Sequence, residues 1–217
     1  MFERRDRGAP GVALARPLYV FGWTAAVYGV NDVLAMIAAA GVVVALSTLA
    51  FIVIERASLG FGSLKPEIAT VCDPAFWRVE RHWKLSDSPL GAAFAGTPMR
   101  NVISRLHGVR VGCKVFDDAC ILSERTLVEI GDEANLNEHS LVQAHSLEEG
   151  EFKFDFVRIG PDCSIGVGCL VHYGVTMNEN THLDADAFLM KGEITPAGSR
   201  WRGNPAKLVH SGAAEAR

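Results

Sequence analysis

The sequence RIGPDCSIGVGCLVHYGVTMNENTHLDADAFLMKGEITPAGSRW, residues 158–201, repeats one short pattern every six residues. An aliphatic or methionine side chain recurs at this spacing, at Ile159, Ile165, Val171, Met177, Leu183 and Leu189. Four residues after each stands a mostly small or β-branched companion, in order Cys163, Cys169, Val175, Thr181, Ala187 and Glu193. Positions six apart would be scattered around an α-helix of 3.6 residues per turn, so the pattern excludes a helix.

Each companion stands two residues before the next aliphatic position, so both side chains are expected on one side of a short strand. The residue directly after each aliphatic position is expected to form a left-handed corner, because four of the six tolerate that backbone. These six are Gly160, Gly166, His172, Asn178, Asp184 and Met190. Strand and corner every six residues predict a mainly β chain with a left-handed parallel β-helix over residues 107–208, three units per triangular turn. An ordinary sheet with chance spacing is the alternative.

The repeat is irregular before residue 157. Val111 begins the register, residues 117–126 fit it badly, and Val142 and Ile159 are 17 residues apart, which is no whole number of units. We expect the excess residues, Leu147 to Phe156, to leave the wall as a loop. A regular β-helix wall offers no cleft, so the loop is the expected place for chemistry.

Composition bounds the remaining possibilities. The chain has 217 residues, 49% of them hydrophobic, and a formal net charge of −4, so no nucleic-acid partner is expected. Its five cysteines include no Cys-x-x-Cys pair. Because Cys163 and Cys169 occupy inward positions of the repeat, they are interpreted as reduced core residues of a cytosol-facing protein rather than a disulfide framework or a thiol site.

The N-terminal quarter predicts a membrane segment, residues 1–57. Val33 to Ile54 is uncharged and mostly apolar, which is long enough to cross a bilayer core, so a transmembrane helix is expected at about 33–55. A weaker apolar stretch at about 12–30 predicts the first arm of a transmembrane α-helical hairpin, with residues 29–32 as its turn. A cleaved signal peptide is the competing interpretation of the arginine-rich start.

The number of crossings decides the side of the membrane. With two crossings, the positive-inside rule places the β-helix domain on the cytoplasmic side; with one, the domain would lie outside. Residues 58–106 are expected to connect membrane and β-helix through short helices, whose aromatic residues suit either the membrane interface or the first β-helix turn. Residues 209–217 are expected to form a tail.

The candidate catalytic residue is His145, which stands immediately before the predicted loop and is expected to point away from the core. An imidazole there can act as a general base near neutral pH if a neighbouring group orients it. Glu124 and Asn137 are polar residues in or near the preceding turn that could orient the imidazole or bind a substrate. A surface role for His145 and a solvated loop position for Glu124 stay open.

Ordered non-repeat motifs resemble the terminal region of the membrane-bound non-ribosomal peptide synthetases that make ε-poly-lysine. The motifs within the β-helix are FDD (116–118), ERTLV (124–128), HSLE (145–148), VHYGVTM (171–177), FLMKGE (188–193) and GNPA (203–206). Those before it are FW (76–77), ER (80–81), WKLS (83–86) and GTP (96–98). The resemblance covers about Phe51 to Leu208 and implies that the chain is similar to the hexapeptide-repeat acyltransferases.

The resemblance implies a membrane-bound acyltransferase domain that forms an amide or isopeptide bond between amino acids. An amine would attack a thioester on coenzyme A or on the phosphopantetheine arm of a carrier, and no other cofactor is expected. His145 would be the base, Glu124 its partner, and Asn137 and His172 substrate contacts. The present chain holds no adenylation or carrier segment, so a carrier protein or adenylation module encoded separately is the expected partner.

Two other functions fit the same fold. Some hexapeptide β-helices are zinc hydrolyases, and four histidines are available here: His139, His145, His172 and His182. His139 and His145 fall on different faces of one turn, so no metal site is expected within one subunit, although a neighbouring subunit could complete one. A non-catalytic, membrane-tethered β-helix that oligomerises and docks a partner is the other alternative. By analogy with relatives of this architecture, a homotrimer is expected.

Overall fold

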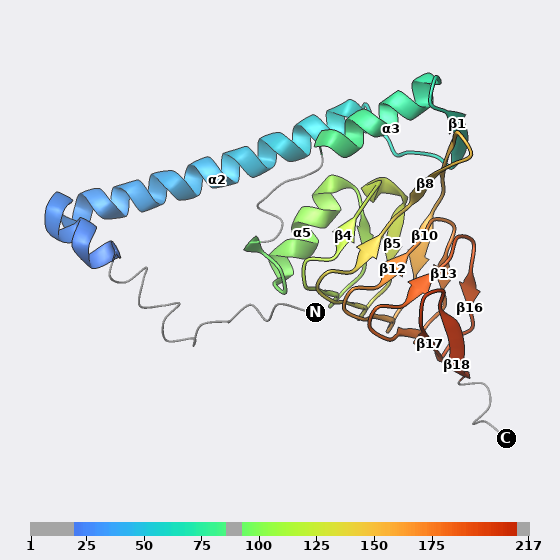
Figure 1. Cartoon of the computed structure of the whole chain (residues 1–217). Helices are drawn as coiled ribbons and strands as arrows, with labels where there is room; N and C mark the ends of the chain where they lie inside the picture. The colour runs from blue at the N-terminus through green and yellow to red at the C-terminus, as the bar shows by residue number, and fades with distance from the viewer. Residues whose placement is uncertain (1–19, 86–92, 212–217) are drawn as a thin grey trace, which may run out of the picture. The chain divides into compact units, whose positions relative to one another are not determined.

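The structure, a computed structural model, describes residues 20–85 and 93–211, and the chain divides into two compact units, Met1–Leu49 and Ala50–Arg217 (Figure 1). The division falls inside helix α2 (Val30–Ser58), and the boundary after residue 57 stays a prediction. Each unit has its own physical basis, and they are described in turn.

The first unit is helical and apolar. Residues 20–28 form a helix that ends at Gly29, whose φ of 85° interrupts it, and α2 begins directly afterwards. The mean hydropathy of α2 reaches 2.7 over an 18-residue window, of which 6% is buried, so α2 is long and apolar enough to cross a membrane. This agrees with the predicted helix at 33–55. Residues 12–19 of the predicted first arm lie outside the described residues, and the hairpin stays a prediction.

The second unit begins with the last turns of α2 and continues with the connector. It contains β1 (Glu67–Thr70), α3 (Pro74–Leu85) and α5 (Pro98–His107). α5 packs on the first turn of the β structure, where Arg100 Nε donates to Asp117 Oδ2 at 2.9 Å and Asn101 Nδ2 donates to the Val115 carbonyl at 2.6 Å. α5 ends at Gly108, whose φ of 103° suits a left-handed helix C-cap. The aromatic side chain of Phe76 packs against the β-helix core.

Three parallel sheets form the body of the unit, and the chain visits them in rotation. The first sheet holds β2 (Arg110–Val111), β5 (Val128–Ile130), β10 (Val157–Ile159), β13 (Thr176–Met177) and β16 (Ile194–Thr195). The second holds β3 (Phe116–Asp117), β6 (Asn135–Leu136), β11 (Ser164–Ile165), β14 (His182–Leu183) and β17 (Ser199–Arg202), closed by the antiparallel β18 (Lys207–Ser211). The third holds β4 (Ile121–Leu122), β7 (Leu141–Val142), β12 (Leu170–Val171) and β15 (Phe188–Leu189).

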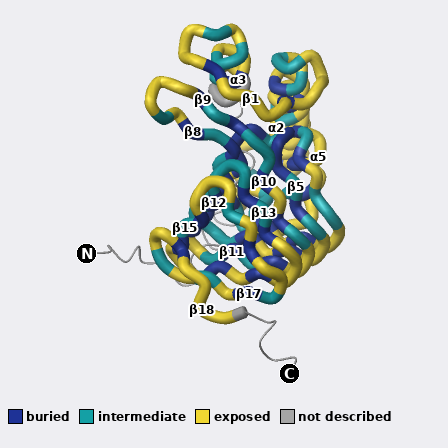
Figure 2. The backbone as a smooth tube through the Cα atoms, turned by 90° about the vertical axis from the view of Figure 1, so that its right-hand side faces the viewer, coloured by how far each residue is buried: buried dark blue, intermediate teal, exposed yellow. Residues whose placement is uncertain are grey.

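Strands one turn apart pair in the predicted hexapeptide register. Val171, for example, pairs with Leu189, and Ile165 with Leu183. The observed rotation among three parallel sheets is a β-helix, as predicted, while its left-handedness stays a prediction. Inward positions are closed to solvent (Figure 2): Cys163 is 0% exposed and Cys169 is 1% exposed. All five cysteines are free, and burial raises the pKa of the Cys120 thiol to about 12, which keeps it inert.

The predicted position of the left-handed corners was wrong by two residues. Positive φ values occur three residues after each aliphatic position, at Asp162, Gly168, Gly174, Asn180, Asp186 and Gly192. Gly160, directly after its aliphatic residue, has a different role: an added Cβ would lie 2.7 Å from the Met177 carbonyl oxygen of the next turn. Gly131 is similar, with the backbone nitrogen of Pro161 at 2.5 Å. Glycine is required at these two positions for close stacking of turns rather than for a bend.

The predicted loop is an antiparallel hairpin, β8 (His145–Glu148) and β9 (Glu151–Phe154), between β7 and β10. It therefore begins at His145, two residues before the predicted start. β1 pairs with β9, from Glu67 opposite Phe154 to Thr70 opposite Glu151, and completes a three-stranded sheet. The connector thus supports the hairpin by a long-range strand pairing.

Candidate active site

Two irregular segments lie on one corner of the β-helix. We call this the site corner: residues 123–127, 143–156, 172–175 and 190–193, which lead from the third sheet to the first. Leu122 pairs with Val142, and Ile130 pairs with Ile159, so the first two segments are neighbours in the stack. Both are longer than the regular corner, and each carries one residue of a buried polar pair.

Glu124 lies at the start of the first irregular segment. It precedes the 3-10 helix η1 (Arg125–Leu127) and has φ 35° and ψ 56°, a left-handed backbone that few residues other than glycine adopt. Its side chain is 1% exposed, so the solvated loop position left open by the sequence is wrong. Ser123 Oγ donates to Glu124 Oε2 at 2.5 Å and accepts from the Ala144 backbone N–H at 2.9 Å.

His145 lies at the start of the second irregular segment and meets Glu124 directly. Its Nδ1 is 2.7 Å from Glu124 Oε2, and its side chain is 20% exposed. Because an ionised carboxylate only accepts, Nδ1–H is the donor, and in the neutral imidazole Nε2 then carries the lone pair. Gln143 Nε2 lies 3.5 Å from that nitrogen. The pair therefore presents an oriented imidazole with a basic nitrogen, the arrangement that general-base chemistry needs.

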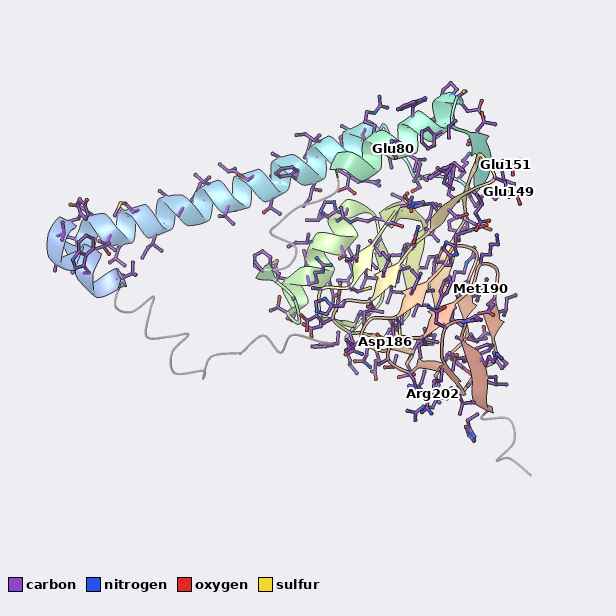
Figure 3. All side chains as sticks on the ribbon, viewed as in Figure 1. Glu80, Glu149, Glu151, Asp186, Met190 and Arg202 are labelled. Carbon is purple, nitrogen blue, oxygen red and sulfur yellow. The ribbon has the colours of Figure 1, made fainter. Side chains whose placement is uncertain are left out.

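Aromatic rings of the hairpin fix the imidazole from the side. The His145 ring stacks on Phe152 with centroids 5.2 Å apart and planes 26° apart. Phe76 of α3 meets the same phenylalanine ring edge-on at 5.2 Å, and Phe154 lies 5.6 Å from it. The hairpin projects beyond the site, with Glu149 and Glu151 at its outer end (Figure 3). The packed rings restrict His145 to one orientation.

The two carboxylate oxygens of Glu124 differ in their hydrogen-bond partners. Among the described residues, the buried Oε1 atom has no hydrogen-bond partner, and neither does the buried Ser146 Oγ. A buried carboxylate oxygen without a donor costs free energy, so such an atom in a folded protein points to a missing donor. Glu124 Oε1 belongs to the same carboxylate that holds His145, which makes a substrate N–H or ammonium group a chemically suitable donor.

His172 lies on the site corner one turn beyond His145. It is half-buried, and burial lowers the pKa of its imidazole, opposed by the Glu148 carboxylate and by the His145 carbonyl. A lowered pKa leaves His172 neutral at pH 7. The hairpin residue Glu148 in turn forms an ion pair with Lys191 of the same corner. The structure therefore gathers His145, Glu124 and His172 on one corner.

Asn137 is not part of this group. It lies on the corner between β6 and β7, and its Nδ2 donates to the Ile165 carbonyl of the next turn at 2.7 Å. Because its amide links successive turns, its side chain has a structural partner. A role for Asn137 in substrate binding stays a prediction that its position does not favour.

Within the described residues, no three His, Cys, Asp or Glu side chains form a set that could hold a metal ion. His139 lies on the same corner as Asn137, away from His145, and its side chain is 74% exposed. An open groove of about 820 Å³ runs along the first sheet, where Arg105, Arg110 and Arg158 line it, and neither His145 nor Glu124 does.

Sequence reasoning missed two supporting residues. Ser123, which bridges Glu124 and the Ala144 N–H, lies in the segment that fitted the repeat badly, and that misfit was its only signal. Phe152 lies inside the excursion, where three phenylalanines, at 152, 154 and 156, alternate with polar residues as in a half-buried strand. That alternation could have predicted the hairpin.

Similarity to known proteins is confined to part of the chain. No protein-family model matches the chain. A delta-poly-L-ornithine synthetase of Acinetobacter baumannii is 35% identical over 111 residues, which cover 51% of this chain and 8% of that protein. The finding supports the resemblance to synthetases in a coarser form, and the ε-poly-lysine type stays a prediction. The chain spans less than a tenth of the length of this relative.

Two solved structures show a distant likeness. A maltose O-acetyltransferase of Clostridium difficile 630 gives a TM-score of 0.47 at 14% identity, over 69% of this chain and 98% of that one. A galactoside acetyltransferase in complex with coenzyme A gives 0.46 at 17% identity, over 67% and 86%. The β-helix described above rests on the strand pairing of this chain itself.

Proposed function

We propose that this chain is an acyltransferase that forms an amide or isopeptide bond from a thioester and an amine, with His145 as general base and Glu124 as its partner. The observation that carries the proposal is the 2.7 Å contact between His145 Nδ1 and the buried Glu124 Oε2. It orients the imidazole, leaves Nε2, which only Gln143 Nε2 approaches at 3.5 Å among the described residues, as the nitrogen that accepts a proton, and places a negative charge where an imidazolium would form.

In the proposed reaction, His145 transfers the proton and Glu124 stabilises the charged imidazole. The nitrogen of the neutral amine attacks the thioester carbonyl carbon, forming the C–N bond, while His145 Nε2 takes the proton that the nitrogen loses. The tetrahedral intermediate collapses, the C–S bond breaks, and the imidazolium returns the proton to the departing thiolate. Glu124 stays ionised throughout and stabilises the imidazolium. A positioned base of this kind contributes roughly 10²–10⁴-fold to the rate.

The unpartnered Glu124 Oε1 supports an amine as the acceptor. A substrate N–H or a second ammonium group would satisfy that oxygen. A hydroxyl could also donate to it, but only an ammonium group would also compensate its negative charge. The similarity to a delta-poly-L-ornithine synthetase supports the same class, an amino acid with a side-chain amine. The donor in this proposal is a thioester on coenzyme A or on phosphopantetheine, with neutral His172 as a further substrate contact.

The wider setting of the proposal follows from the sequence. An apolar helix as long as α2 supports attachment to a membrane. The cytoplasmic side, the separately encoded carrier or adenylation module, and the homotrimer belong to the same proposal. The zinc hydrolyase alternative has less support, because His139 and His145 lie on different corners of the β-helix.

The test uses the full-length protein in detergent micelles. N-acetylcysteamine thioesters of L-ornithine and L-lysine mimic the end of a phosphopantetheine arm and supply both thioester and amine, and mass spectrometry follows dipeptide formation. We expect His145→Ala to lower the rate by roughly 10²–10⁴-fold while circular dichroism shows an intact fold. His139→Ala, which alters an exposed imidazole on another corner, is the matched control and should keep the wild-type rate.

Two outcomes would contradict the proposal. A His145→Ala protein with the full rate would remove the proposed base. Wild-type protein that forms no dipeptide from either thioester would argue for the non-catalytic docking β-helix instead.

A further inference from the structure

A second buried polar cluster lies directly beside Glu124. Glu55, in the last turns of α2 and within the second compact unit, is 0% exposed. Its Oε2 accepts from Arg125 Nη1 at 2.7 Å and also contacts His107 Nδ1. Arg125 is the next residue after Glu124 and the first of η1. The cluster therefore joins three elements: the end of α2, the end of α5 and η1.

Other contacts hold η1 in the same place. Thr126 Oγ1 accepts from the Leu64 backbone N–H at 3.1 Å in a buried position. Gly108 approaches so closely that an added Cβ would lie 2.5 Å from Arg56 Nη1 and 2.9 Å from Thr126 Cγ2. Removing one partner of a buried ion pair leaves an uncompensated charge and is strongly destabilising, so the Glu55 contacts define where η1 can lie.

The position of η1 is important because of the backbone conformation of Glu124. Glu124 is the residue before η1, and its left-handed conformation, φ 35° and ψ 56°, is strained for a residue with a side chain. Such conformations persist only where the surrounding structure over-determines them. Two backbone hydrogen bonds flank this residue: the Ser123 N–H donates to the Val142 carbonyl at 3.0 Å, and the Leu127 N–H donates to the Glu124 carbonyl at 2.7 Å. The second bond closes η1, whose first residue, Arg125, meets Glu55.

We propose that Glu55 and Arg125 are positioning residues for Glu124, so that the end of the apolar helix α2 helps to order the His145–Glu124 pair. This inference rests on the proposed function for its catalytic meaning. Its physical basis is a continuous set of contacts, from Glu55 to Arg125, through the backbone to Glu124, and on to His145. In this arrangement α2 contributes to the site as well as to any membrane attachment.

The first experiment is a double-mutant cycle with Glu55→Gln and Glu124→Gln, assayed with the lysine thioester described above. We expect Glu55→Gln to lower kcat by about 10-fold to 100-fold through misplacement of the pair, with KM changed by less than about 2-fold. In the Glu124→Gln background, the same change should lower kcat by less than about 2-fold, because the group it positions is already lost.

The matched control is Asp117→Asn. Asp117 also forms a buried ion pair between the β-helix and a helix, with Arg100 of α5, but it lies in β3 of the second sheet, outside the site corner. It should destabilise the protein without selectively lowering kcat, and its effect should be the same in the wild-type and Glu124→Gln backgrounds. Equal loss of kcat from Glu55→Gln in both backgrounds would show a merely structural role and overturn the inference.

A second readout needs no turnover. Diethyl pyrocarbonate labels accessible imidazoles, and peptide mass spectrometry resolves the labelling rate of each histidine at pH 8. We expect Glu55→Gln and Glu124→Gln each to raise the rate at His145 several-fold, because a ring that loses its anchor is more accessible, while Asp117→Asn does not. Unchanged labelling in Glu55→Gln would overturn the positioning role. Wild-type protein without turnover, but with this labelling pattern, would refute the proposed reaction and keep the positioning.

Discussion

The turns from residue 157 onward and the two turns before them are built from the same repeat, yet they differ in what holds them. In the later turns, backbone stacks on backbone, and the wall has short corners of constant length. In the earlier turns, the site corner is expanded twice, by η1 and by the hairpin, and side-chain contacts take over. The regular turns therefore form the scaffold, and the two expanded segments of the site corner form the polar site.

The largest effect expected on stability tests the irregular side of the comparison. Phe152→Ala removes a buried ring that contacts His145, Phe76 and Phe154, and should lower the free energy of unfolding by about 3–5 kcal/mol. Chemical denaturation followed by circular dichroism measures it. Phe116→Ala, whose ring is 41% exposed, is the control and should cost far less. An unchanged free energy for Phe152→Ala would mean that the hairpin contributes nothing to the fold.

A smaller effect tests the regular stacking of turns. Gly131→Ala places a Cβ 2.5 Å from the Pro161 backbone nitrogen, which cannot move aside cheaply, so we expect a loss of about 3 kcal/mol in the free energy of unfolding. In Gly192→Ala the added Cβ meets no atom within 4 Å. We therefore expect the free energy of unfolding to fall by only about 1 kcal/mol, from the strain of a side chain at a φ of 72°. The same denaturation experiment compares the two. A larger loss in Gly192→Ala would mean that the backbone conformation of the corners, rather than the close stacking of turns, contributes more to the stability of the β-helix.

The smallest effect concerns pH. Burial lowers the pKa of His172 below its ordinary value of 6.5, so the unfolded chain binds the proton more readily than the folded one. His172 therefore favours the fold fully above about pH 6.5, and this contribution is lost as the pH falls through the folded pKa. The Glu148 carboxylate, the Lys191 ammonium group, and the imidazole and backbone carbonyl of His145 face the same ring and modulate the shift.

We expect melting temperatures between pH 7.5 and pH 5 to fall less steeply in His172→Gln than in wild type. His182→Gln, on an exposed histidine of β14, is the matched control and should follow the wild-type curve. A steeper fall in His172→Gln would reverse the sign and contradict the burial argument.

Much of the site was predictable because irregularities of a short repeat are visible in the sequence. The spacing of 17 residues from Val142 to Ile159 indicated an excursion beside His145, whereas residues 117–126, which include Glu124, showed only a poor fit to the repeat. The sequence did not predict that the segments of Glu124 and His145 lie on the same corner. Their alignment depends on how a shortened and a lengthened segment of the first turn compensate each other. Asn137 had an equally suitable place in the sequence and falls on a different corner.

The sequence by itself determined the β-helix and its inward residues, because a six-residue period with small companions has few ways to bury its apolar side chains. It also determined a helix apolar enough for a membrane. Only the tertiary structure decided that Glu124 is buried against His145 and that Glu55 reaches Arg125. Those contacts join residues 21 and 70 positions apart, and no local pattern encodes a pairing set by stacking of turns and docking of a helix end.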